Sequence, residues 1–302
     1  MSDVDAAPQF DTEEAALPSA ARRSRQVSIW ASIRQQRLAM TGLILVGLFL
    51  LVALIGPYIA PYGPTEQAIT DALQPPNSKH WLGTDDFGRD IFSRLLYGAR
   101  ISLEVGVVAV GIAGTIGILL GLLAGYVGGW VDNVLTLLMD VIFAFPAILL
   151  AIAIISLLGN NLTNAMVAIA IVYMPTFMRV VRGATLSVRH TAYVESAVAL
   201  GAATPRILGR HIFPNITAPL IVHSSLVFAF AVLAEASLAF LGLGNKPPSP
   251  SWGSMVSASY GFLRLAPWAA IVPGVAIALA VLGFNLLGDG LRDALDPRSR
   301  SL

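Results

Sequence analysis

Long apolar stretches that are nearly free of charge constrain this chain more than any other feature. The first of them, residues 38–59, contains no charged residue at all. A helix of about 20 apolar residues is long enough to cross the hydrocarbon core of a bilayer. The whole chain is 56% apolar and 12% charged, whereas soluble domains carry about 25% charged residues. The sequence therefore predicts a membrane protein, and it excludes both a soluble enzyme and a disordered chain.

Six such stretches predict an all-α, polytopic membrane protein. We expect transmembrane helices at residues 38–59, 101–127, 133–158, 162–181, 215–243 and 268–287. Residues 1–37 are polar, acidic and rich in Pro and Ala, which predicts a largely disordered N-terminal tail. The remaining divisions are a loop at 60–100, a core of five helices at 101–288 that includes a polar insert at 182–214, and a C-terminal tail at 289–302.

The distribution of Lys and Arg predicts the orientation of these helices. Six helices place both termini and the polar insert on the same side of the membrane. That side holds thirteen of the Lys and Arg residues, and the opposite side holds six. Because Lys and Arg are enriched in cytoplasmic segments, we expect the termini and the insert in the cytoplasm. The loop at 60–100 then lies outside.

The sequence contains no recognisable catalytic or cofactor site. A phosphate-binding loop needs a Lys directly after Gly, but Lys79 follows Ser78 and Lys246 follows Asn245. The chain has no cysteine, and its four histidines show no zinc-protease spacing. A net charge of +1 argues against a nucleic-acid partner. We therefore expect a non-catalytic chain without a cofactor or metal of its own.

Two carboxylates lie within the predicted membrane helices. Ionisable groups at such a depth are costly and are functional-site hypotheses by default. Asp140 lies about two turns into the third predicted helix, and Glu235 lies in the outer part of the fifth. A proton relay is one interpretation. Alternatively, Asp140 pairs with a cytoplasmic Arg, and Glu235 caps a kinked outer half-helix as a structural or gating residue at the mouth of a pathway.

Glycines recur every fourth residue on one face of the second predicted helix, at Gly117, Gly121 and Gly125. In lipid, small residues at this spacing allow two helix backbones to approach closely. The stripe therefore predicts a tight helix–helix contact, which is either static packing, the interpretation we favour, or a contact that moves during function.

The polar insert is predicted to be a hairpin of two short helices. Gly201 suits the left-handed position that ends the first helix. Thr204 is a suitable N-cap for the second helix, with Pro205 in its first turn, and Pro214 marks its end. Apolar residues make the hairpin amphipathic, and arginines flank it: Val198, Leu200, Ile207, Leu208, Phe213, Arg189, Arg206 and Arg210. An apolar hairpin in water either docks a protein partner or packs against the protein's own helix ends or the lipid surface.

The residues of this hairpin resemble the EAA loop of ABC-importer permeases. That loop has the pattern E-A-A-x-x-x-G, then nine residues, then I-x-L-P. The chain supplies Glu, Ala and Gly at 195, 197 and 201 and Pro at 214, and it departs from the pattern at Ser196, His211 and Phe213. The His-Ile-x-Pro-Asn ending is typical of the dipeptide/oligopeptide/nickel permeases.

Four further segments resemble the same subfamily, in the same order along the chain. They are LGTDDFGRD at 82–90, LLAGYVGGW at 122–130, EASLAFLGL at 235–243 with the following PPSPSWG, and NLLGDGLRDALDPR at 285–298. The resemblance covers about residues 34–298. It identifies the chain as similar to the C-type permease subunit of such an importer, a binding-protein-dependent transport system inner membrane component with a type I permease fold.

The resemblance implies a bacterial inner-membrane subunit that works with several partners. These are a second homologous permease, two P-loop ATPases that bind ATP and Mg²⁺, and an extracytoplasmic substrate-binding protein. The hairpin would couple the ATPases to transport through Glu195, Ala197, Gly201, Thr204, Pro205, Arg206, Arg210, His211 and Pro214. Dipeptides or oligopeptides are the expected substrates, although relatives also carry nickel complexes and sugars. The alternative is an ion-coupled secondary transporter that uses Asp140 and Glu235.

Overall fold

The computed structural model describes residues 36–295 and is helical apart from its loops. The predicted N-terminal tail lies almost wholly outside these residues, as do residues 296–302. The helices are α2 (Arg37–Ile59), α3 (Ile91–Val127), α4 (Gly129–Phe143), α5 (Ala147–Leu158), α6 (Leu162–Arg189), α7 (Ala192–Ala199), α8 (Thr204–Arg206), α9 (Phe213–Phe240), α10 (Trp252–Ser259) and α11 (Trp268–Leu295). Short 3₁₀ turns occur at Ile69–Asp71 and Tyr260–Phe262, and a π-helical turn at Ile207–Ile212 joins α8 to α9.

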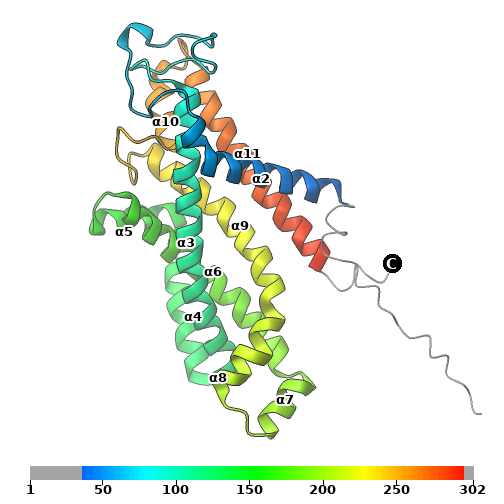
Figure 1. Cartoon of the computed structure of the whole chain (residues 1–302). Helices are drawn as coiled ribbons and strands as arrows, with labels where there is room; N and C mark the ends of the chain where they lie inside the picture. The colour runs from blue at the N-terminus through cyan, green and yellow to red at the C-terminus, as the bar shows by residue number, and fades with distance from the viewer. Residues whose placement is uncertain (1–35, 296–302) are drawn as a thin grey trace, which may run out of the picture.

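Five helices in the described residues are long and apolar enough to cross a membrane: α2, α3, α6, α11 and the continuous helix Thr204–Phe240. The prediction of one continuous helix over 133–158 is wrong. Two shorter helices, α4 and α5, occupy this stretch and meet at 91°, with α5 projecting sideways from the bundle (Figure 1). The break falls at Pro146, the N-cap of α5, because proline disfavours the helical conformation at the residue before it. If α4 and α5 are counted as one bent span, the described residues hold six spans.

Several helices extend beyond the boundaries predicted for them. α3 begins at Ile91 instead of residue 101, so the preceding loop is shorter than predicted. Asp90 caps α3 by accepting a hydrogen bond from the backbone N–H of Ser93 at 2.7 Å. α6 continues to Arg189 and α11 to Leu295, eight residues past each predicted end. Charged residues at helix ends weaken a hydropathy signal without ending the helix, so hydropathy underestimates helix length.

The glycine stripe of α3 packs directly against α6. A Cβ atom added at Gly117 or Gly121 would lie 2.5 or 2.6 Å from the Cβ of Phe177 or Val181. At Gly125 the added atom would lie 2.7 Å from the Cβ of Thr185. The stripe therefore forms the close helix–helix contact that its spacing predicts, and this contact holds α3 and α6 together as the centre of the bundle.

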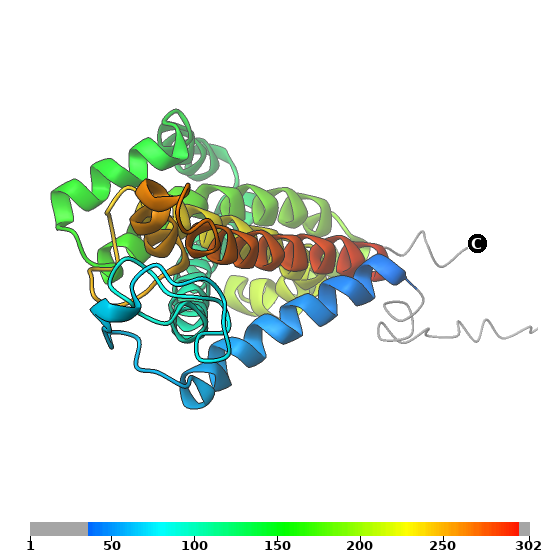
Figure 2. The same cartoon turned by 90° about the horizontal axis from the view of Figure 1, so that it is seen from above.

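The core has two main parts. One is formed by α3, α5, α6, α9 and the hairpin around α7, and it includes Ile155, Phe177 and Ile207. The other joins α2, α3, α10 and α11 around Phe49 and Trp252. Figure 2 shows α2 and α11 meeting near the ends of the described chain, where Gly290 leaves room for Ala39. α2 and α11 pack on each other, and α11 also packs on α9 and α10 while α2 packs on α3, so both helices are part of the bundle.

The two ends of the bundle differ in character. One end, which we call the hairpin end, carries α7 and the turn at 200–203 (Figure 1). The other, the loop end, carries residues 60–90 and 241–267. Here a buried polar network folds the first loop: Arg89 donates to Asp85 at 2.6 Å, and His80 Nδ1 lies 3.0 Å from Asp90. Arg94 then joins this loop to the second one by donating to the carbonyls of Pro64 and Pro248, and Trp268 Nε1 donates to the carbonyl of Thr84 at 3.4 Å.

Candidate functional site: the hairpin and an adjacent cleft

The turn of the hairpin is built around Gly201. Its φ is +73°, the left-handed conformation that the sequence predicts. The backbone N–H of Ala202 donates to the carbonyl of Ala197 at 3.0 Å, and that of Gly201 donates to Val198 at 2.9 Å. These two bonds form a Schellman motif, which satisfies the last carbonyls of α7. Glycine is favoured at 201 because an L-residue there would be strained.

The second half of the hairpin differs from the prediction in two ways. Thr204 is not the N-cap: Ala203 occupies that position without a side-chain hydrogen bond, and Thr204 is the first helical residue, followed by Pro205. Pro214 does not end the helix, because Thr204–Phe240 is continuous. Proline has no N–H for the usual helical bond. The π-helical turn just before Pro214 widens the helix at this point, and Asn215 Nδ2 donates to the carbonyl of His211 at 2.7 Å.

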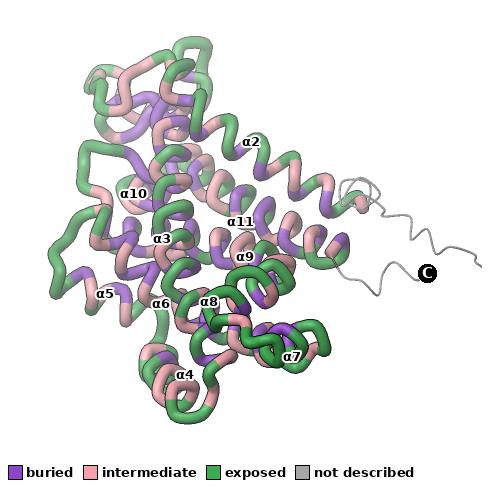
Figure 3. Tube along the Cα trace, turned by 60° about the horizontal axis from the view of Figure 1, so that its bottom comes forward, coloured by how far each residue is buried: buried purple, intermediate pink, exposed green. Residues whose placement is uncertain are grey.

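The hairpin has one buried face and one exposed face (Figure 3). Val194, Ile207 and Ile212 are buried in the first core. On the exposed face, Leu200 is 87% exposed and Val198 is 51% exposed. One face therefore packs on the protein's own helices, as one interpretation expects. The other presents apolar side chains outward, and the docking of a protein partner on it stays a prediction.

Charged side chains surround this exposed face. Glu195, Arg206 and Arg210 are exposed, and none of them makes a side-chain hydrogen bond or ion pair within residues 36–295. His211 is partly buried, and its backbone carbonyl, not its ring, bonds to Asn215. A surface that combines unpaired charges with exposed apolar side chains is typical of a protein docking site.

Ion pairs attach α4 to α6 beside the hairpin. Arg182 makes a bidentate pair with Asp132, in which its Nη2 lies 2.6 Å from Oδ2. Arg179 Nη2 lies 2.7 Å from Asp140 Oδ1, and both side chains are about half exposed. Asp140 therefore pairs with an Arg, as one of the two interpretations expects, and the cytoplasmic position of this pair stays a prediction.

Glu235 has the opposite environment. It is 3% exposed in the half of α9 nearer the loop end, and neither carboxylate oxygen has a hydrogen-bond partner within the described residues. The neighbouring residue Ala236 packs against Gly253 of α10, where an added Cβ would lie 2.2 Å from the Ala236 carbonyl oxygen. No hydrogen bond or ion pair in the described part of the chain joins Glu235 to Asp140.

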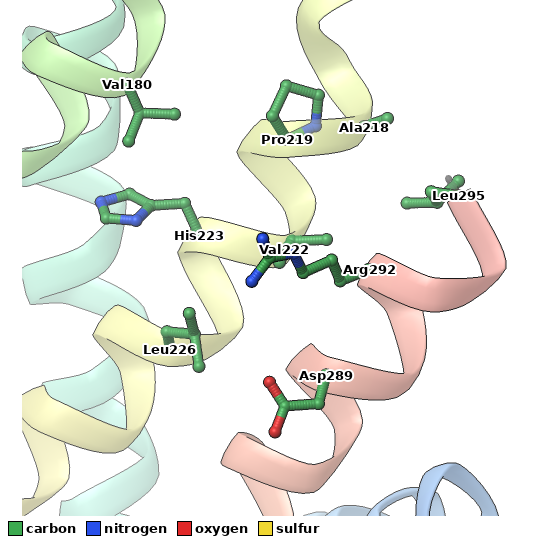
Figure 4. Close-up of a pocket in the computed structure, with 9 residues that line it drawn as sticks. All are labelled: Val180, Ala218, Pro219, Val222, His223, Leu226, Asp289, Arg292 and Leu295. Atoms are coloured by element: carbon green, nitrogen blue, oxygen red, sulfur yellow. The ribbon is translucent and has the colours of Figure 1, made fainter. Parts of the chain in front are cut away.

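A cleft of about 480 Å³ opens between α6, α9 and α11, toward the hairpin end. Its walls are largely apolar, with three polar side chains, His223, Asp289 and Arg292, facing the same space (Figure 4). The ring of His223 is fixed by a hydrogen-bond contact of 2.9 Å with Thr176. Sequence reasoning did not find this cleft, although the GDGLRD segment holding Asp289 and Arg292 was part of the resemblance.

Comparison with known protein families explains these features. The family model described as "Binding-protein-dependent transport system inner membrane component" matches residues 117–301. The chain belongs to this family. A second model, the N-terminal TM domain of oligopeptide transport permease C, matches residues 25–76 of the permease. The chain is therefore a permease subunit of an ABC importer, and a transport subunit of this kind is not itself an enzyme.

Curated relatives resemble the permease over nearly its whole length. The dipeptide transport system permease protein DppC of Alkalihalophilus pseudofirmus is 48% identical over 269 residues, which is 89% of this chain and 88% of the relative. The glutathione transport system permease protein GsiD of Pectobacterium atrosepticum is 45% identical over 273 residues, 90% of this chain and 91% of the relative. A GsiD protein of Escherichia coli is 47% identical over 270 residues, covering 89% of both chains.

The structure brings together most of the residues singled out in the permease's hairpin, but not its two carboxylates. Residues 195–214 form one continuous substructure that is packed beneath α6 and α9. Asp140 and Glu235 lie on different helices in different surroundings. In the part of the chain that the structure describes, no group of three or more His, Asp or Glu side chains could hold a metal ion.

Proposed function

We propose that this permease imports short peptides across the bacterial inner membrane, driven by ATP hydrolysis in two partner ATPase subunits. It forms the pathway together with a second homologous permease and receives its substrate from an extracytoplasmic binding protein. Two of the relatives named above are permeases for dipeptides and for glutathione, which are both short peptides. ATP and Mg²⁺ bind to the ATPases and not to this chain.

The observation that carries this proposal is the mechanical continuity between the hairpin and a membrane helix. The helix Thr204–Phe240 has 37 residues without a break, which corresponds to about 55 Å at 1.5 Å per residue. The exposed face around Leu200 lies at one end of it, and the Schellman motif at Gly201 fixes the angle to α7. A push on this face by an ATPase is therefore transmitted along α9 to the far side of the membrane.

In this proposal the hairpin end is cytoplasmic and the loop end is extracytoplasmic. The unpaired charges of Glu195, Arg206 and Arg210 complement charges of opposite sign on an ATPase groove, and the exposed apolar side chains enter that groove. The loop end, with its folded segments 60–90 and 241–267, receives the binding protein.

A cysteine placed on the hairpin tests this arrangement, because the natural chain has no cysteine to interfere. We expect a Leu200→Cys permease in inside-out vesicles to react with a membrane-impermeant maleimide when the ATPases are absent. Assembly with the two ATPases should protect it at least about tenfold. The control is Trp81→Cys on the first loop, where the side chain is 63% exposed. It should react only in right-side-out vesicles, with or without the ATPases.

Two results would contradict the proposal. Labelling of Leu200→Cys that is unaffected by the ATPases would show that the hairpin is not their docking site. Peptide uptake that continues after ATP depletion would favour the ion-coupled alternative. That alternative has little support here, since Asp140 is already paired with Arg179.

A further inference from the structure

The cleft beside α9 exists because α9 and α11 are in contact near Gly288 and diverge from there toward the hairpin end. At the contact, Gly288 lies so close that an added Cβ would be 2.5 Å from Ser225 Oγ. The rings of Phe228 and Phe284 stack at 4.1 Å one turn further toward the loop end. Toward the hairpin end the two helices diverge (Figure 1), so the cleft is a wedge that is closed at Gly288 and open at the hairpin end.

Two opposite charges face this wedge without neutralising each other. Asp289 and Arg292 are both exposed, and neither has a hydrogen bond or ion pair with any residue in the range 36–295. The surrounding wall is mainly apolar and includes Pro219, Val222 and Leu226 of α9 (Figure 4). A volume of about 480 Å³ falls in the range of small-molecule sites, about 300–1,000 Å³.

The spacing of the two charges fits a particular ligand shape. Residues three apart on a helix lie on the same face, with their Cβ atoms about 5–6 Å apart. An extended dipeptide spans about 7 Å, because each residue adds at most about 3.3–3.6 Å. The flexible Arg292 side chain covers the difference. One end of a dipeptide can thus meet the guanidinium while the other end meets the carboxylate.

We propose that this cleft is a transit site for a zwitterionic peptide of about two residues. Arg292 binds the C-terminal carboxylate, for which the planar guanidinium offers two parallel donors. Asp289 binds the N-terminal ammonium group, and the α9 wall accepts the peptide's apolar side chains without selecting among them. This inference rests on the proposed function, since it assumes that short peptides cross this permease.

An anionic lipid headgroup fits the cleft less well. An anionic headgroup would satisfy Arg292 but would be repelled by Asp289, three residues away on the same face of α11. Only a ligand that carries both charges satisfies both side chains. Free peptide termini have this property, and so does a zwitterionic phosphoethanolamine headgroup. Only the peptide can be capped to remove one charge at a time, so competition by capped peptides distinguishes the two ligands and tests each residue separately.

The test uses the complete transporter, with both permeases and both ATPases, in nanodiscs. The probe is the dipeptide alanyl-leucine in which the leucine carries a photoreactive diazirine, and the labelled peptides are mapped by mass spectrometry. We expect labelling of Val222 or Leu226. Unlabelled Ala-Leu should compete at least about tenfold better than N-acetyl-Ala-Leu or Ala-Leu-amide, since charge-assisted hydrogen bonds are lost in the capped forms.

Two variants assign the charges. Arg292→Gln should abolish the preference for Ala-Leu over its amide and leave the preference over the N-acetyl form. Asp289→Asn should do the reverse. The control is Arg264→Gln. Arg264 is an exposed arginine just before α11 begins, at the end of the helix far from the cleft, and its replacement should change neither preference.

Several outcomes would overturn the proposal. These are labelling outside the cleft, equal competition by capped and free peptides, or copurification of a lipid that Arg292→Gln releases. Loss of assembly with the second permease in both variants would likewise show that the two charges form a subunit contact instead.

ATP-driven uptake of Ala-Leu is measured on the same preparations. Uptake without cleft labelling would refute the transit site and leave the proposed function standing, whereas no uptake would refute the proposed function.

Discussion

Replacement of Gly201 is the sharpest test of the hairpin as a transmitting element. A non-glycine residue in the left-handed conformation costs about 1–2 kcal/mol, and a β-branched residue such as valine is among the least suited to it. The structure isolates this cost, because within residues 36–295 an added Cβ at Gly201 has no atom within 4 Å apart from those of its chain neighbours. Gly201→Val should therefore strain the backbone of the turn without creating a steric clash.

A cost of 1–2 kcal/mol reduces the population of the correctly formed turn about 5–30-fold. In proteoliposomes that contain the complete transporter, we expect peptide uptake per ATP hydrolysed to fall by up to that factor, while the amount of folded permease stays unchanged. Gly201→Asn should retain most of the coupling, because asparagine tolerates the left-handed conformation.

The matched control is Gly209→Val in the same hairpin. An added Cβ at Gly209 likewise meets no atom within 4 Å in the described part of the chain outside its own helix backbone, but the φ of Gly209 is not positive. This variant should stay coupled. If Gly201→Val transports with native coupling, or if Gly209→Val is equally impaired, the left-handed turn is not what links the ATPases to α9.

Three further predictions concern the packing of the bundle. Gly121→Leu should destabilise the permease by about 3 kcal/mol or more, since the added Cβ would lie 2.6 Å from a side chain of α6. The control is Gly111→Leu, where an added Cβ meets no atom of another described element within 4 Å, and equal thermal melting of the two variants would contradict the packing argument. Arg182→Gln should lower the free energy of unfolding by about 0.5–1 kcal/mol and increase proteolysis near α4, because the ion pair with Asp132 is lost. Unchanged proteolysis would show that this ion pair does not hold α4 against α6. Glu235→Gln should raise the melting temperature, because neither oxygen of this buried carboxyl group has a hydrogen-bond partner within residues 36–295 and a charge at such a site is penalised by desolvation, whereas glutamine carries none. A lower melting temperature would show that Glu235 is stabilised in the assembled transporter.

The sequence predicts the membrane helices well because hydropathy depends on composition over a long window, but it does not predict how proline acts within them. Pro175, Pro219 and Pro273 lie inside α6, α9 and α11 without ending them. Pro146 separates α4 from α5, which meet at 91°. Neighbouring helices can accommodate a proline within a membrane helix. Whether a given proline breaks its helix is therefore decided by tertiary packing, which periodicity does not report.

The candidate site shows the same division between local and tertiary information. The left-handed conformation of Gly201 is predictable because it depends on residue type and on the adjacent turn. The cleft is not predictable, because it requires that His223 of α9 and Arg292 of α11 face one space. The tilt of α11 that brings this about is set by contacts such as that between Gly288 and Ser225, which hydropathy and spacing do not specify.

The hydrogen bonds at the loop end impose an order on the biosynthesis of this chain. Arg94 is buried and donates to the carbonyl of Pro64 at 2.7 Å and to that of Pro248, 154 residues later in the sequence, at 3.4 Å. Trp252 likewise donates to the carbonyl of Leu95 at 2.9 Å. A nascent chain that has not yet passed residue 252 lacks both late partners, however well its first helices have inserted. The loop end of the permease is thus completed only late in translation, after residue 252 has been synthesised.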